Sequence, residues 1–168
     1  MQESERIKII GVGISVVNFD SAQKYLFDNF EQARGKYICA ANVHTTVTAH
    51  EDENYRNIQN ASFMTLPDGK PLSVVGKKRG KGSMGRVTGP DFLEAILKRT
   101  EKTELKHYFY GTTQENLDSF ISVIRKTYPD LKIVGAEPSI FRPLSMKEED
   151  DLIKRINESE ADFVWIAL

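Results

Sequence analysis

The sequence predicts an α/β fold of the Rossmann-like type, with a mostly parallel sheet and helices on both of its faces. Runs rich in Val, Ile and aromatic residues alternate with amphipathic segments of helical length. This alternation is typical of successive βαβ units, whose strands are parallel. The chain has 168 residues, 40% of them hydrophobic, which suits one domain with a packed core. We therefore expect a single domain over residues 1–168.

Several runs have the composition of strands. They lie at 7–17, 36–41, 62–66, 106–110, 131–135 and 162–168. The last run, "ADFVWIAL", is typical of a buried strand and ends where a ligand-facing loop would begin. Because a natural domain rarely ends on a bare apolar strand, we expect the chain to be truncated at its C-terminus. An uncovered terminal strand can also pair with another chain, so a homo-oligomer is one expectation.

Amphipathic segments between these runs begin at residues that favour helix N-termini. Asp20 or Ser21 is expected to cap "SAQKYLFDNFEQA", and Thr113 is expected to cap "QENLDSFISVIRKTY". Ser145 precedes "MKEEDDLIKRINES", whose acids come early and whose Lys154 and Arg155 come late, as the helix dipole favours. The sequence has no internal repeat and no convincing linker.

Charge and cysteine content limit the classes of partner. The 23 basic and 24 acidic residues give a net charge of −1, so no global field draws the chain to nucleic acid or to an anionic membrane. Any basic site must be local. A single cysteine, Cys39, argues against a disulfide framework and for the cytoplasm. The N-terminus lacks a signal-peptide core, and no apolar run approaches the roughly 20 residues that span a bilayer. We expect a soluble or peripheral protein.

Polar residues follow the second strand at the edge of the sheet where ligands bind in such folds. Asn42 and His44 lie in "CAANVHTTVTAH", just after that strand. An amide at this position can bond a sugar or a phosphate. Alternatively, Asn42 caps the helix "VHTTVTAH" and His44 only packs beside it.

An acid between two turn-forming residues follows the third strand. Asp68 lies between Pro67 and Gly69, which fix the backbone and so give its carboxylate a set direction. A turn alone would explain this triplet. However, cations without an acid follow it among glycines, and such a run suits an anion such as a diphosphate, with Asp68 as a general base. These cations are Lys77, Lys78, Arg79, Lys81 and Arg86.

Two further helix starts are candidate phosphate sites. In "RVTGPDFLEAIL", Thr88 or Gly89 is expected near the cap and Pro90 in the first turn, and helix N-termini bind phosphate through free N–H groups. Gly111 and Thr112 form a turn after the fourth strand that could receive a nucleotide, although glycine turns are common there in α/β folds. Arg142, in a loop bounded by prolines, gives a weaker signal.

Several motifs are absent from the sequence. There is no P-loop, and "GVGISV" lacks the third glycine of a dinucleotide fingerprint. There is no Asp-x-Asp pair and no Gly-x-Ser-x-Gly, and the acid runs at 51–53 and 148–151 suit solvated helices. With three scattered histidines and one cysteine, we expect neither a metal site nor a cofactor.

The order and spacing of several segments resemble the WecG/TagA/CpsF family of bacterial glycosyltransferases. The segments are "ANVHTTVTA", "LPDGKPLSVV", "RVTGPDF", "YFYGTTQENLD" and "INESEADFVWIAL". The resemblance implies an inverting, metal-independent enzyme that moves an N-acetylmannosamine-type sugar from a UDP donor to an undecaprenyl-diphosphate-linked sugar, in teichoic acid, common antigen or capsule synthesis. It also implies peripheral contact with the inner face of the membrane through a C-terminal appendage, absent here.

The resemblance also assigns roles to residues. It makes Asp68 the catalytic base, Arg86 the residue that offsets diphosphate charge, and Asn42 a pocket residue; Ala40 stands where many members have Thr. The other substrate-binding candidates are Gly69, Thr88, Gly111 and Thr112. Two alternatives stay open: a non-catalytic module of the same fold that binds a nucleotide or phospho-ligand, and a purely structural domain.

Overall fold

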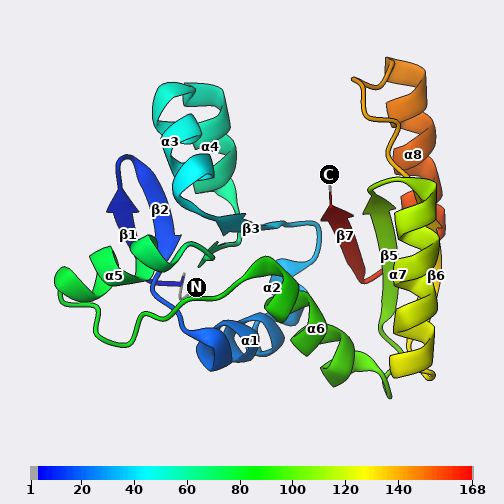
Figure 1. Ribbon diagram of the computed structural model, residues 1–168, viewed down its shortest axis with the longest axis horizontal. Coiled ribbons are helices and arrows are strands. Elements are labelled where there is room, and N and C mark those ends of the chain that lie inside the picture. The colour runs from blue at the N-terminus through cyan, green and yellow to red at the C-terminus, as the bar shows by residue number, and fades with distance from the viewer. Residues whose placement is uncertain (1–3, 168) are drawn as a thin grey trace. The chain divides into compact units, whose positions relative to one another are not determined.

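The computed structural model describes residues 4–167, and alternating strands and helices confirm the α/β class (Figure 1). The chain forms two compact units, Met1–Ala95 and Ile96–Leu168, and each is described here by itself. Strand pairing is parallel in both units except in one hairpin. No described helix combines the length and apolar composition needed to cross a bilayer.

The first unit holds a hairpin, a parallel pair of strands and the helices that surround them. Its elements are β1 (Arg6–Ile9), β2 (Val12–Ser15), α1 (Phe19–Asp28), α2 (Phe30–Ala33), β3 (Ile38–Ala41), α3 (Val43–Glu51), α4 (Glu53–Ala61), β4 (Met64–Pro67), α5 (Lys70–Lys78) and the start of α6 (Gly89–Thr100). β3 and β4 pair in parallel, with Ile38 opposite Met64 and Ala41 opposite Pro67. The core combines residues of the hairpin with Ala41, Ala49, Leu72 and Met84.

The first expected strand is two strands. Within 7–17 the chain reverses at Ile10 (φ 41°) and Gly11 (φ 94°), so β1 and β2 form an antiparallel hairpin. Positive φ at both central residues is the geometry of the tight turns that suit twisted hairpins. The expectation of one strand was wrong because apolar residues flank the turn on both sides, so no polar break marks it.

Helix caps agree with the sequence except at α1. Thr113 caps α7 (Gln114–Thr127), and Ser145 forms a capping box with Glu148 at α8 (Met146–Glu158). For α1 the cap is Asn18, not Asp20 or Ser21: Asn18 Oδ1 accepts from Ser21 N, and Ser21 Oγ accepts from Asn18 N. The capping pair is therefore Asn-x-x-Ser, and the helix cap lies two or three residues before the expected one.

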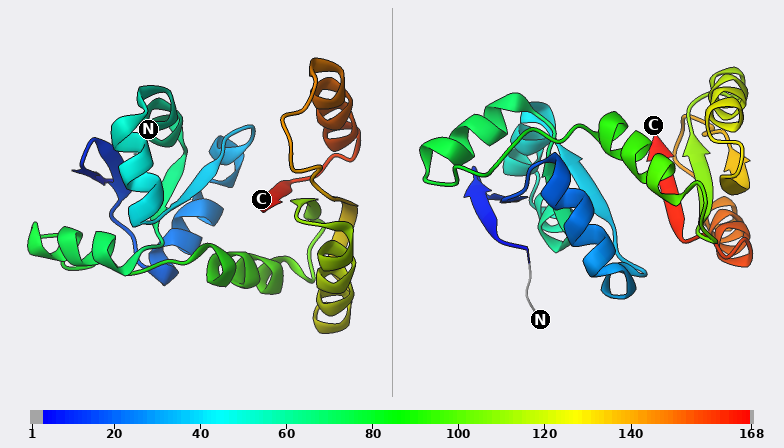
Figure 2. Two further views of the ribbon diagram at one scale, coloured as in Figure 1. Left: turned by 45° about the horizontal axis from the view of Figure 1, so that its top comes forward. Right: turned by 90° about the horizontal axis from the view of Figure 1, so that it is seen from below.

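The second unit contains a parallel sheet of three strands. They are β5 (Lys106–Gly111), β6 (Lys132–Glu137) and β7 (Phe163–Ala167), in the order β6-β5-β7. Figure 2 shows β7, in red, beside the green β5. The expectation of a buried last strand holds only in part, because Val164 and Ile166 are exposed. Leu168, the end of that expected strand, lies outside the described residues.

A buried histidine joins the middle strand to its neighbours. Trp165 Nε1 donates to His107 Nδ1 at 3.0 Å, and His107 Nε2 lies 2.9 Å from Thr100 Oγ1. Since an indole N–H can only donate, Nδ1 carries no proton and Nε2–H donates to the threonine. His107 is fully buried, and this burial lowers its pKa to about 4. A neutral histidine is thus part of the packing of this unit.

Helix α8 is attached to the same sheet by an ion pair. Arg155 contacts both carboxylate oxygens of Glu137, at 2.7 Å for Nη2–Oε2 and 2.9 Å for Nε–Oε1. The hydroxyl of Tyr108 donates to the same carboxylate. Arg155 holds the pKa of Glu137 below its usual range, and burial raises the pKa of Tyr108 to about 12. The carboxylate therefore stays charged and links β5, β6 and α8.

Acid should destabilise the protein through His107. Its pKa is lower in the folded than in the unfolded chain, so its contribution is fully present above pH 6.5 and is lost as pH falls from 6.5 towards 4. Between neutral pH and pH 5, the free energy of unfolding should fall by about 2 kcal/mol from this group. Urea unfolding at both pH values should show this fall in the parent and a smaller one in His107→Gln; equal falls would contradict it.

Candidate active site

Two predicted site residues follow paired positions at the ends of β3 and β4. Ala41 and Pro67 are register partners, so Asn42 and Asp68 leave the two strands side by side. The carbonyl oxygen of Ala41 accepts from Asp68 N at 2.9 Å and from Gly69 N at 3.1 Å. The pairing of the two strand ends therefore fixes the backbone positions of Asn42 and Asp68.

Asn42 caps α3, as one of the two readings of the sequence has it. Its Oδ1 accepts from Thr45 N at 3.0 Å, and Thr45 Oγ1 accepts from Asn42 N at 3.0 Å. The Nδ2 group of Asn42 has no hydrogen-bond partner among the described residues, so it can still donate to a ligand. Capping and ligand binding are therefore compatible. His44, the second residue of α3, is exposed.

Gly69 allows two helix N-termini to come close together. It precedes α5, and a Cβ built on it would lie 3.1 Å from Asn42 Cα and 3.3 Å from Val43 N. A side chain would push α5 away from α3. No side chain caps the N-terminus of α5, where Pro71 has no N–H and Leu72 N donates to Gly69 O at 2.9 Å. The Lys70 N–H and the positive end of the helix dipole therefore lie next to Asp68.

Arg86 is the cation that the structure places beside Asp68. Its Nε donates to the carbonyl oxygen of Asp68 at 2.7 Å, and its Nη2 lies 3.9 Å from Asp68 Oδ1. Next to it, Val87 N donates to Pro67 O at 3.0 Å. The Asp68 side chain is 22% exposed and that of Arg86 is 56% exposed, so both can meet a ligand from solvent. A carboxylate that can accept a proton thus lies beside a fixed positive charge.

The segment that carries Arg86 is held by a contact that the sequence did not reveal. Gly85 N donates to Val17 O at 2.9 Å, and Asn18 Nδ2 donates to Ser83 O at 3.3 Å. A Cβ on Gly85 would lie 2.9 Å from Asn18 Cβ and 3.3 Å from its Cα. The only local signal is the capping pattern at Asn18, which does not indicate its distant neighbour.

Thr88 lies at the start of α6, as expected. Its Oγ1 accepts from Asp91 N at 3.2 Å, and its carbonyl accepts from Phe92 N at 3.0 Å. Gly89 faces β3, because a Cβ on it would lie 3.5 Å from Ala40 Cβ. The N-terminus of α6 therefore borders the same strand ends, and Thr88 joins Asn42, Asp68 and Arg86 in the first unit.

The other cations of the basic run do not accompany Asp68. Lys77 and Lys78 lie in the last turn of α5 and Arg79 is its C-cap, whereas Asp68 precedes its first turn. Nine helical residues separate the two ends by about 13 Å. Arg79 Nη1 donates to Lys8 O at 2.5 Å, and Lys81 pairs with Glu5. The expectation that the whole run holds one anion beside Asp68 was therefore wrong: the helix separates Arg86 from the others.

Gly111 and Thr112 belong to the second unit, so the structure does not join them to the Asp68 site. Gly111 is the last residue of β5 and Thr112 follows it, with φ values of 130° and 55°; the second value is unusual for a residue other than glycine. Thr112 O accepts from Ser139 N at 3.0 Å. Arg142 pairs with Glu148 at 2.7 Å, and this pair stabilises the start of α8. The ligand role of these residues stays a prediction.

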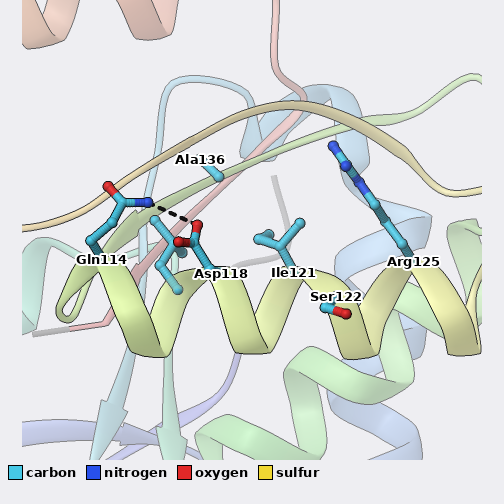
Figure 3. Close-up of a pocket in the computed structure, with 7 residues that line it drawn as sticks. Gln114, Asp118, Ile121, Ser122, Arg125 and Ala136 are labelled. Carbon is cyan, nitrogen blue, oxygen red and sulfur yellow. Dashed lines mark hydrogen bonds between the residues drawn. The ribbon is translucent and has the colours of Figure 1, made fainter.

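A hollow in the second unit lies along α7 (Figure 3). It is lined by Gln114, Leu117, Asp118, Ile121, Ser122 and Arg125 of α7 and by Ala136 of β6. Gln114 Nε2 donates to Asp118 Oδ1 at 2.8 Å, and these polar side chains share one exposed helix face. None of the predicted site residues lines it, and we assign it no role.

Comparison with known proteins decides the family. The profile described as "Glycosyl transferase WecG/TagA/CpsF family" matches residues 7–168. The chain belongs to the WecG/TagA/CpsF family of glycosyl transferases.

Two curated relatives carry the same name. The chain is 24% identical over 138 residues to N-acetylglucosaminyldiphosphoundecaprenol N-acetyl-beta-D-mannosaminyltransferase of Bacillus spizizenii. These residues are 82% of this chain and 52% of that protein. The chain is 24% identical over 152 residues to the protein of that name from Bacillus subtilis, covering 90% and 57%. This member of the WecG/TagA/CpsF family therefore spans about half the length of these relatives.

Substitution of Gly69 tests the close approach at the strand ends. Gly69→Ala should lower the free energy of unfolding by about 1–3 kcal/mol, because the new methyl group overlaps the backbone at Asn42. Gly82→Ala is the matched control, since a Cβ there meets nothing within 4 Å. Urea unfolding should separate the two variants; equal stabilities would contradict the tight contact.

Proposed function

We propose that this chain provides the catalytic site of an inverting glycosyltransferase. It would move an N-acetylmannosamine-type sugar from a UDP donor to an undecaprenyl-diphosphate-linked sugar in cell-surface polysaccharide synthesis. The observation that carries the proposal is Asp68 at the paired strand ends, with Arg86 bonded to its backbone. Family membership and the names of the two relatives support the choice of donor sugar and acceptor.

The reaction follows from the chemistry of the site. Asp68 takes the proton of the acceptor hydroxyl as its oxygen attacks the anomeric carbon of the donor sugar. The new C–O bond forms on the face opposite the diphosphate, and the bond to UDP breaks with its electron pair leaving on the β-phosphate. One displacement of this kind inverts the anomeric configuration. The proton ends on Asp68 and is later lost to solvent.

Charge on the departing UDP is offset by the protein in this proposal. Arg86 supplies a fixed positive charge beside Asp68, and the uncapped N-terminus of α5 supplies the Lys70 N–H and the positive end of its dipole. The Nδ2 group of Asn42 can donate to a sugar or phosphate oxygen. These groups would stabilise developing negative charge without a metal ion. Because the acceptor is a lipid, we place the reaction at the cytoplasmic face of the membrane, with peripheral contact.

Loss of the proposed base tests the chemistry. With the full-length gene product, Asp68→Asn should lower sugar transfer from a UDP donor to a lipid-diphosphate acceptor by about 10²- to 10⁴-fold. UDP binding, measured by calorimetry, should persist because the amide keeps the shape of the site. Asp91→Asn, an exposed acid in the first turn of α6, is the control and should keep full turnover. Unchanged turnover in Asp68→Asn would remove Asp68 from the mechanism; UDP binding without any turnover in the parent would favour the non-catalytic module.

A rescue experiment tests how Arg86 is positioned. Gly85→Ala should lower kcat/KM about tenfold, because its methyl group pushes the Arg86 segment away from Asn18, and small displacements of a charged group are costly to catalysis. Asn18→Gly removes the opposing Cβ and keeps an acceptable helix cap. The double variant should recover most of the lost activity. Full activity in Gly85→Ala alone, or no recovery in the double variant, would contradict this account.

A further inference from the structure

The basic run after Asp68 needs an explanation that the active site does not give. Between Gly69 and Pro90 the sequence has six cations and no acid. Arg86 contacts Asp68, and Lys81 pairs with Glu5. The remaining cations are Lys70, Lys77, Lys78 and Arg79, all exposed and carried by α5 or its C-cap.

One face of α5 presents these cations to solvent. Lys70, Val74, Lys77 and Lys78 recur at the three- and four-residue spacing of a single helix face, and all are exposed. The opposite face, with Leu72, Ser73 and Gly76, is buried. Val74 is an apolar side chain with 41% exposure in the middle of the charged face. The apolar face of α5 is thus used within the protein, and its exposed face can attract anionic lipid headgroups through its cations.

A neighbouring strand extends the charge. Lys8 on β1 is exposed, and its carbonyl accepts from Arg79 Nη1 at 2.5 Å. In the part of the chain that the structure describes, none of Lys8, Lys70, Lys77, Lys78 and Arg79 has an ion-pair partner. We call these five residues, with Val74, the basic face of α5. The helix dipole favours cations at the C-terminus of α5 but explains neither Lys8 nor Lys70.

We propose that the basic face of α5 docks on a bilayer surface rich in anionic phospholipid. The proposal rests on the proposed function, because a lipid-linked acceptor requires the enzyme to work at a membrane. α5 begins at Lys70, two residues after Asp68, so docking along this helix would bring the proposed base to the level of the lipid headgroups. The diphosphate of a lipid-linked sugar lies at that level.

Nucleic acid fits the basic face less well. From Gly69 to Pro90 there is no aromatic residue on which a base could stack. The chain as a whole carries a net charge of −1, so it lacks the overall basic character of most nucleic-acid-binding domains. An anionic membrane needs only a local cluster of cations, each of which strengthens binding about fivefold.

Vesicle binding tests the proposal directly. The full chain should sediment with vesicles made of phosphatidylglycerol and phosphatidylcholine in equal parts, not with phosphatidylcholine alone, and added salt should weaken the binding. Lys77→Glu/Lys78→Glu should lower the partition coefficient at least about 25-fold. Lys77→Gln/Lys78→Gln removes the two charges without placing an acid at the helix C-terminus, so it should lower the partition coefficient by about 25-fold.

A control of equal charge separates the face from the net charge. Lys126→Glu/Lys147→Glu changes two exposed lysines of the second unit, α7 and α8, by the same amount. It should bind vesicles within about twofold of the parent. Equal losses in both Glu variants, or parent-like binding by Lys77→Glu/Lys78→Glu, would overturn the proposal. The proposal would also be overturned if a single-stranded oligonucleotide bound more tightly than the vesicles and this binding depended on Lys77 and Lys78.

Two measurements distinguish failure of the docking from failure of the chemistry. Asp68→Asn should bind vesicles like the parent, because docking does not use the base. Lys77→Glu/Lys78→Glu should keep its turnover on a short-chain, water-soluble acceptor and lose it on an acceptor embedded in vesicles. Loss of turnover on the soluble acceptor would place the lysines in the active site and overturn the docking role.

Discussion

The candidate site depends on one backbone interaction, the hydrogen bonds that the carbonyl oxygen of Ala41 accepts from Asp68 and Gly69. They extend the parallel pairing of β3 and β4 by one step beyond the last strand residues. Without them Asp68 would no longer be bonded to the end of β3, and its carboxylate would lose its fixed relation to Asn42. Gly69 makes the interaction possible, since a side chain there would meet the backbone of α3.

The position of the strand ends also determines where the charged groups lie. Arg86 binds the backbone of Asp68, so its charge is held at the strand ends, and its position depends on the contact between Gly85 and Asn18. Helix α5 leads away from the same point and carries Lys77, Lys78 and Arg79 to its far end. One contiguous basic stretch in the sequence therefore becomes two features in space: a single cation at the site and a charged helix face outside it.

Local signals allowed much of the fold and site to be predicted from the sequence. The strand ends at Asn42 and Asp68 are visible because apolar runs stop at polar, turn-forming residues. The hairpin at Gly11 was missed because its turn lies inside an apolar run. The contact between Asn18 and Gly85 joins residues 67 positions apart, so no local pattern could indicate it. The cations were grouped wrongly because neighbours in sequence were taken as neighbours in space.

The most direct measurement is a titration of the isotope-labelled chain with UDP, followed by amide chemical shifts. The central claim is that the ends of β3 and β4 form the donor site. It predicts saturable changes in the amide shifts of Val43, Asp68, Gly69 and Arg86. In Arg86→Ala, UDP should bind much more weakly, and the changes at the other three amides should need more UDP. Shifts confined to the second unit, or shifts that Arg86→Ala leaves unchanged, would contradict the claim.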